Sequence, residues 1–171
     1  DRPEEMGLYL ETTQKLNDIL NTLDESVMAY HTKDRDGKIA AYAWDDTMDT
    51  VNAVEFTDNE ITACKLTRET KKLYRKVKIG YAKNNYIQQK TDEDTTAENW
   101  ADPYKYVEDS DDTVKYKHNC DEELPVDTLL RDKTDAETVA DRYLDIVSKV
   151  WLTVELKARL KPFQVSIGDT I

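Results

Sequence analysis

The chain has 171 residues, of which 39% are hydrophobic and 35% charged, and its formal net charge is −12. This length suits one domain, residues 1–171, or two small lobes at 1–85 and 86–171. No apolar run approaches the roughly 20 residues of a membrane-spanning helix, and such an acidic surface repels phosphate backbones. We therefore expect no membrane span and no direct nucleic-acid binding.

The N-terminal part contains a predicted helix and a predicted hairpin. Residues 2–27 carry an apolar stripe at helical spacing, with the core of the helix at residues 12–24. Two runs rich in apolar and aromatic residues flank Asp36-Gly37, which predicts a β-hairpin that turns at Gly37. The stripe consists of Leu16, Ile19, Leu20, Leu23 and Val27, with Met6, Leu10 and Thr13 extending it backward.

The middle of the chain predicts several strands. We expect a short strand at 53–57 and a turn at Asp58-Asn59. Residues 61–73 suit either a strand or irregular structure, and the run TACKL (62–66) favours the strand. Strict alternation from Tyr74 to Tyr81 predicts a further strand, with a partner at 86–89. Residues 90–112 combine acidic runs with a short aromatic segment, which predicts a long excursion with one helical turn near Trp100.

The last sixty residues contain the clearest pattern. Alternation at 113–118 predicts a strand, and Pro125 keeps Leu124 extended. Thr134 and Glu137 have the spacing of a capping box, which starts a helix at Thr134. Alternation at 152–160 predicts a half-buried strand, followed by a turn and a second strand. The helix carries one apolar stripe: Ala136, Val139, Ala140, Tyr143, Leu144, Val147 and Val150. The predicted fold class is α+β, with two main helices packed on a mixed or antiparallel β-sheet.

Residue types that support catalysis occur without the sequence motifs that usually accompany them in active sites. His31 and His118 both fall in predicted strands, and no nucleophile motif accompanies them. The turn at 34–37 begins like a calcium loop, but its Gly comes early and the twelfth position is Asp45. The four glycines form no phosphate-binding loop. We therefore predict no enzyme activity, no catalytic residue, no metal and no cofactor.

Two features leave alternatives open. The acidic run at 108–112 suits a solvated loop better than a weak cation site. Cys64 and Cys120 lack metal-type spacing, and we expect two unpaired thiols rather than a disulfide.

The aromatic composition favours Tyr and Trp over Phe, with ten Tyr, three Trp and two Phe. Such rings serve ordinary packing, or contacts with protein or carbohydrate, because each joins a flat apolar body to a polar tip. The candidate interaction residues are Trp100, Tyr104 and Tyr106, which lie together in the predicted excursion.

Three segments near the C-terminus resemble a known family. The runs AETVADRYL (136–144), VELKA (154–158) and IGDTI (167–171) are similar to central hub, or tail tip, proteins of tailed bacteriophages and prophages. In that family a helix with spaced alanines precedes a strand, a turn, and Gly-Asp followed by an aliphatic residue. The resemblance covers roughly the last forty residues, and this sequence departs from the family in lacking the other hub domains.

The resemblance implies a structural role in a virion rather than chemistry. The chain would be one domain of a larger tail protein, made in the bacterial cytoplasm and placed in a ring, commonly trimeric, at the distal end of the tail. Its partners would be other tail proteins and its own copies. The alternative is a module that binds a host-surface carbohydrate or receptor.

Overall fold

A computed structural model describes most of the chain, and its elements alternate irregularly between helix and strand. Within the described residues it has three helices and seven strands, which confirms the predicted α+β class. No helix of this described part is long and apolar enough to cross a membrane. The described residues are 3–10, 13–33, 37–44, 53–68, 72–85, 103–159 and 165.

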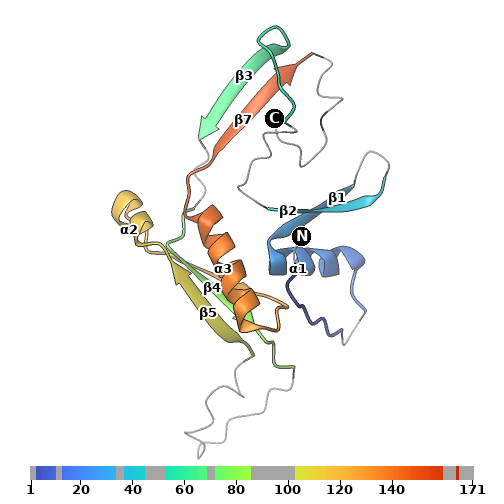
Figure 1. The fold of residues 1–171 in the computed structure, drawn as a ribbon, viewed down its shortest axis with the longest axis vertical. Helices are drawn as coiled ribbons and strands as arrows, with labels where there is room; N and C mark the ends of the chain where they lie inside the picture. The colour runs from blue at the N-terminus through green and yellow to red at the C-terminus, as the bar shows by residue number, and fades with distance from the viewer. Residues whose placement is uncertain are drawn as a thin grey trace, which may run out of the picture.

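The centre of the fold is a three-stranded mixed sheet with one helix on it (Figure 1). Strand β4 (Lys76–Tyr81) lies in the middle, antiparallel to β5 (Lys105–Ser110) and parallel to β6 (Glu123–Asp127). Helix α3 (Lys133–Val147) covers the face to which β4 contributes its alternating apolar residues. The core consists of Val27, Val77, Ile79, Leu130, Ala136, Val139, Ala140 and Leu144.

Helix α3 confirms the predicted stripe but not the predicted cap. Ala136, Val139 and Ala140 are fully buried, and Tyr143 and Val147 pack against the same core. The N-cap is Asp132, whose carboxylate accepts the Thr134 amide at 2.8 Å. Glu137 instead forms an ion pair with Lys133 at 3.1 Å. The capping-box prediction was wrong because an equally good N-cap residue stands two positions earlier.

The N-terminal unit is a helix followed directly by a hairpin. Helix α1 (Leu16–Val27) ends at Met28, which adopts the left-handed conformation, and β1 (Ala29–Lys33) pairs antiparallel with β2 (Ile39–Ala43). The predicted hairpin is therefore confirmed. The backward extension of the helix is wrong, because residues 3–10 contain no helix and residues 5–7 pair with residues 129–131. These tertiary hydrogen bonds override the weak helical signal.

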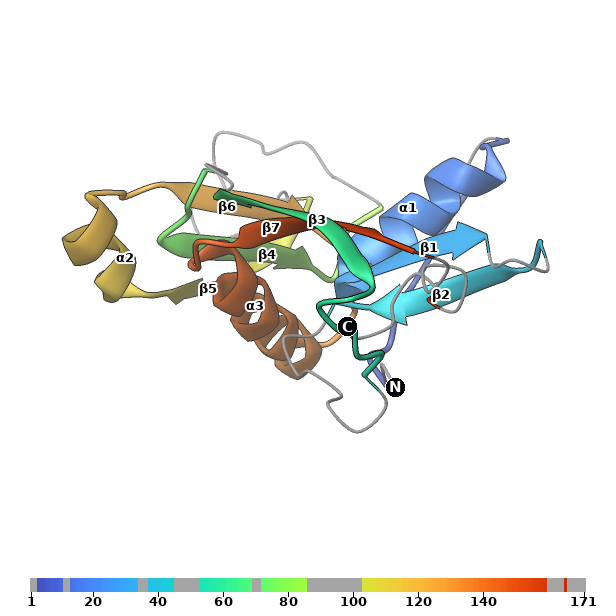
Figure 2. The same ribbon diagram turned by 90° about the horizontal axis from the view of Figure 1, so that it is seen from above.

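Strands β3 (Ile61–Arg68) and β7 (Leu152–Ala158) form a separate antiparallel ribbon, which we call the arm. Figure 1 shows the arm extending away from α3 at one end of the molecule, and Figure 2 shows it from above. Both strands were predicted, and so was the turn that precedes β3 at residues 58–60. The strand predicted at 53–57 is wrong, since those residues have no regular structure.

The segment between β4 and α3 differs most from the prediction. Residues 105–110 form β5 instead of part of an excursion, and residues 123–127 form β6. The predicted strand at 113–118 is instead helix α2 (Asp112–His118). The Asp111 carboxylate accepts the Thr113 amide at 2.8 Å, and Asn119 closes the helix in the left-handed conformation. These two caps decide the structure of a segment whose apolar pattern is weak.

Several predictions fall outside the described residues. They are the turn at 34–36, the partner strand at 86–89, the excursion at 90–102 with its helical turn near Trp100, and the second strand with Gly168-Asp169.

Candidate functional site

Two of the three predicted interaction residues lie together on the sheet. Tyr104 and Tyr106 approach with ring centroids 6.4 Å apart and ring planes tilted by 46°. They belong to the face of the sheet opposite α3, which we call the open sheet face. Trp100, the third predicted residue, lies outside the described residues.

Gly80 allows the two rings to lie close to the sheet. It stands opposite Tyr106 on one side and Asp127 on the other in the strand register. A Cβ atom at Gly80 would lie 2.7 Å from Oδ1 of Asp127 and 3.2 Å from atoms of both tyrosine rings. Because Gly80 has no side chain, the backbone of β4 leaves space for the two tyrosine rings to pack directly over it.

Charged groups surround this aromatic pair. The Lys78 ammonium lies 4.5 Å from the centre of the Tyr106 ring, within cation–π range. Burial, followed by the charge of Asp127, raises the pKa of Tyr104, so its hydroxyl stays protonated and can donate a hydrogen bond. The open sheet face thus offers ring surfaces, an ammonium and a carboxylate. Those groups suit binding of a polar partner, and they include no nucleophile paired with a base.

The acidic run at 108–112 is engaged in contacts within the chain. Glu108 pairs with Lys76 at 2.6 Å, and this hydrogen bond lowers the pKa of the Glu108 carboxyl. Asp112 pairs with Arg75 at 2.6 Å, and Asp111 caps α2. In the described part of the chain, no group of three or more metal-ligating side chains gathers at one place.

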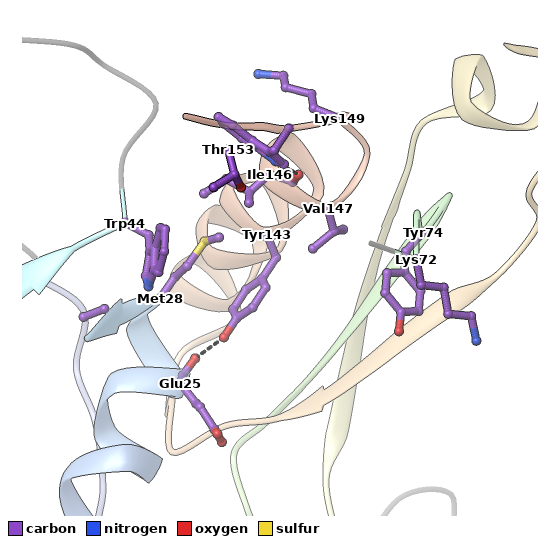
Figure 3. Close-up of a pocket in the computed structure, with 12 residues that line it drawn as sticks. Glu25, Met28, Trp44, Lys72, Tyr74, Tyr143, Ile146, Val147, Lys149 and Thr153 are labelled. Atoms are coloured by element: carbon purple, nitrogen blue, oxygen red, sulfur yellow. Dashed lines mark hydrogen bonds between the residues drawn. The ribbon is translucent and has the colours of Figure 1, made fainter. Parts of the chain in front are cut away.

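A second concave region lies where α1, the hairpin, α3 and the arm meet (Figure 3). This aromatic cleft has a volume of about 720 Å³, within the range of roughly 300 to 1,000 Å³ typical of ligand sites. In Figure 3, Trp44 and Met28 lie on one side of Tyr143, and Val147 and Tyr74 lie on the other. The lining residues are Glu25, Met28, Ala29, Trp44, Lys72, Tyr74, Tyr143, Ile146, Val147, Lys149, Trp151 and Thr153.

The polar atoms of two cleft rings are bonded to the protein itself. The Tyr143 hydroxyl donates to the Glu25 carbonyl oxygen at 2.6 Å, and the Trp151 indole donates to the Ile146 carbonyl oxygen at 2.8 Å. Burial, followed by the charge of Glu25, raises the pKa of Tyr143 to about 12. With these polar atoms satisfied, the two residues have mainly apolar ring surface left to offer a partner.

The arm has one apolar face and one polar face. Residues directly opposite in an antiparallel pair share a face. The polar face carries the pairs Lys65–Glu155 and Thr67–Thr153. The apolar face is formed by Cys64, Leu66, Arg68, Leu152, Val154 and Leu156.

This apolar face is open to solvent. Leu66 is 67% exposed, Leu152 63% and Val154 48%. The alternation of β7 was predicted, but its interpretation as a half-buried strand is wrong for Leu152 and Val154. Alternation of apolar and polar residues predicts that a strand has one apolar and one polar face. It does not predict whether another part of the protein covers the apolar face.

The histidines and cysteines do not form a reactive cluster. His31 contacts the Asp24 carboxylate through Nδ1 and lies 3.2 Å from Oδ1 of Asn17 through Nε2, so it ties β1 to α1. His118 is exposed at the end of α2. Cys64 and Cys120 are free thiols, and the Cys120 thiol donates to the Leu73 carbonyl oxygen.

No protein-family model matches the chain, and comparison with the curated proteins gave no significant match.

Proposed function

We propose that this protein is a structural component of the tail tip or hub of a phage or prophage, where it mediates subunit assembly at the distal end of the tail. The observation that carries the proposal is the open apolar face of the arm. The family resemblance adds to it, because two of the three similar segments are α3 and β7, and β7 is one strand of the arm.

An open apolar ribbon indicates a surface that a partner covers. A two-stranded ribbon is only marginally stable in water without further packing. Within the described residues the ribbon also has no third strand, and open strand edges pair with other chains. We infer that the arm is completed by other tail proteins and by copies of the same chain, as in a homo-trimeric ring. This role needs no catalytic residue.

The direct test is the location of the protein in tailed particles. Particles induced from the organism that encodes the chain would be purified, analysed by mass spectrometry and labelled with an antibody raised against residues 1–171. We expect the chain in the particles and gold label at the distal end of the tail. Absence from the particles, or label at the capsid, would contradict the proposal.

The alternative, a module that binds a host-surface carbohydrate or receptor, has one specific observation in its favour. Tyr104 and Tyr106 lie over Gly80 on the open sheet face, beside Lys78 and Asp127. Under this alternative, Tyr104→Ala with Tyr106→Ala would abolish adsorption of the particle to its host and leave assembly intact. Under the structural proposal, adsorption by assembled particles is unchanged.

A further inference from the structure

We propose that the apolar face of the arm docks in the aromatic cleft of a second copy of this chain. This inference rests on the proposed function and names the partner of the arm. Four features of the molecule support it: the charge of the arm, the small area of its apolar face, the chemistry of the cleft, and the direction in which the apolar face points.

The charge of the arm is opposite to that of the rest of the chain. Residues 61–68 and 152–159 contain four cationic side chains, Lys65, Arg68, Lys157 and Arg159, against the single carboxylate of Glu155. The arm with the residue that follows it is therefore +3, and because the whole chain is −12, the remainder is −15. A second copy supplies an acidic body that attracts a basic arm.

Contact between two arms alone would be repulsive and would bury little surface. Each arm has a net charge of +3, so two arms repel each other. From the usual rise and spacing of strands, the apolar face measures roughly 15 Å by 10 Å. That is well under the roughly 800 Å² per partner that a stable interface buries. The body of the second copy must therefore provide the rest of the contact.

The aromatic cleft has the chemistry to receive the apolar face. Its rings offer apolar surface to Leu66 and Val154, and Arg68 on the same face can stack on an aromatic ring. Two cleft lysines already have acidic partners, Lys72 with Glu122 and Lys149 with Asp145.

Glu25 is the one acidic residue among the residues that line the cleft. With the charges of both lysines balanced by their partners, the cleft carries no net positive charge that would repel a cationic arm.

The arm does not occupy the cleft of its own chain. Thr153, on the polar face, lines that cleft, so the apolar face of the same ribbon is turned away from it. The donor surface and the acceptor surface are therefore different patches of one molecule. Such a contact is head-to-tail, and it closes into a ring or continues as a chain of subunits.

The test measures self-association of the purified chain by sedimentation velocity, up to about 200 µM, where even weak association populates the complex. Leu66→Glu adds a charge to the apolar face, and Ala63→Glu adds the same charge to the polar face of the same strand, at the end away from the cleft residue Thr153. Trp44→Ala removes one aromatic ring from the cleft, and its control Tyr116→Ala removes an exposed ring on α2, far from the arm in sequence.

We expect at least tenfold weaker association for Leu66→Glu and Trp44→Ala, and less than a twofold change for the two controls.

A mixture of the two defective variants gives the sharpest result. An intact cleft on Leu66→Glu and an intact arm on Trp44→Ala together make one complete contact, so the mixture should form dimers and stop there. Raising the salt from about 50 mM to about 500 mM should weaken wild-type association, because the charge attraction is screened.

Four results would overturn the inference: a monomeric wild type, equal effects of Leu66→Glu and Ala63→Glu, no dimer in the mixture, or association unchanged by salt. The inference and the proposed function can fail separately. Self-association through this contact by a chain absent from tail particles would contradict only the proposed function. Particles that assemble normally with Leu66→Glu would contradict only this inference.

Discussion

At the scale of single residues, Gly80 shows how the open sheet face depends on a missing side chain. A Cβ atom there would meet Oδ1 of Asp127 and both tyrosine rings. We expect Gly80→Ala to lower the free energy of unfolding by about 1 to 3 kcal/mol, the usual cost of overpacking. Urea denaturation measures this change.

The same position allows a double-mutant test. Asp127→Ala removes the atom that would lie nearest the new methyl group, so it should recover part of the loss in a Gly80→Ala background. Additive effects of the two substitutions would contradict the steric explanation.

Tyr143 predicts a dependence of stability on alkaline pH. Its pKa is raised from 10.0 to about 12 in the folded protein. The unfolded chain therefore releases the proton first, and this contribution to stability is full below pH 10 and is lost as the pH rises toward 12. Tyr143→Phe has no phenol to ionise. At about pH 8, Tyr143→Phe should be less stable than wild type by about 1 kcal/mol, because it loses the hydrogen bond to Glu25.

The stability of wild type relative to Tyr143→Phe should then fall by about 1 to 2 kcal/mol between the two pKa values, so that the Phe variant becomes the equally stable or more stable protein near pH 12. Chemical denaturation at a series of pH values measures it. Tyr116 is 83% exposed, so Tyr116→Phe serves as the control and should differ from wild type by a constant amount. A constant difference for Tyr143→Phe would contradict the account of its burial.

At the scale of elements, the N-cap of α3 can be tested against the predicted capping box. Asp132→Ala removes the acceptor of the Thr134 amide and should cost about 1 kcal/mol of unfolding free energy. Glu137→Ala removes only an exposed ion pair with Lys133 and should cost less than about 0.5 kcal/mol. Thermal and urea unfolding of both variants separate the two assignments, and a larger loss for Glu137→Ala would favour the capping box.

The elements that could be predicted are those whose signal is local and strong. The stripe from Ala136 to Val147 defined α3, and the runs on either side of Gly37 defined the hairpin. The failures occurred where caps or distant contacts decide the structure. Alternation of Val114, Tyr116 and His118 favoured a strand, yet caps at both ends make α2. The parallel pairing of β6 with β4 depends on contacts between residues far apart in sequence.

The two candidate sites also differ in whether they depend on local sequence or on distant contacts. Tyr104 directly precedes β5 and Tyr106 lies in it, and their closeness in sequence was sufficient to group them. The aromatic cleft takes Trp44, Tyr74, Tyr143 and Trp151 from four separate segments. No spacing rule joins such residues before the fold is known. The stripe that contains Tyr143 was the available signal, and it indicated only core packing.

At the scale of the whole molecule, the protein divides its apolar residues between a small core and an open arm. The core joins α1, the central sheet and α3, and the residues of α3 that were expected to face inward do so. Leu66, Leu152 and Val154 remain exposed on a ribbon whose charge is opposite to that of the body. A molecule built in this way is expected to gain stability when its arm is covered.

Hydrogen exchange of the arm amides tests this claim most directly, because it measures local opening element by element. The purified chain would be compared by mass spectrometry when dilute and when associated. We expect peptides of β3 and β7 to exchange at least about tenfold more slowly in the associated state, while peptides of β4 and β5 keep their rates. An arm that is already as protected in the dilute chain as β4, or an arm whose exchange does not change on association, would contradict the account.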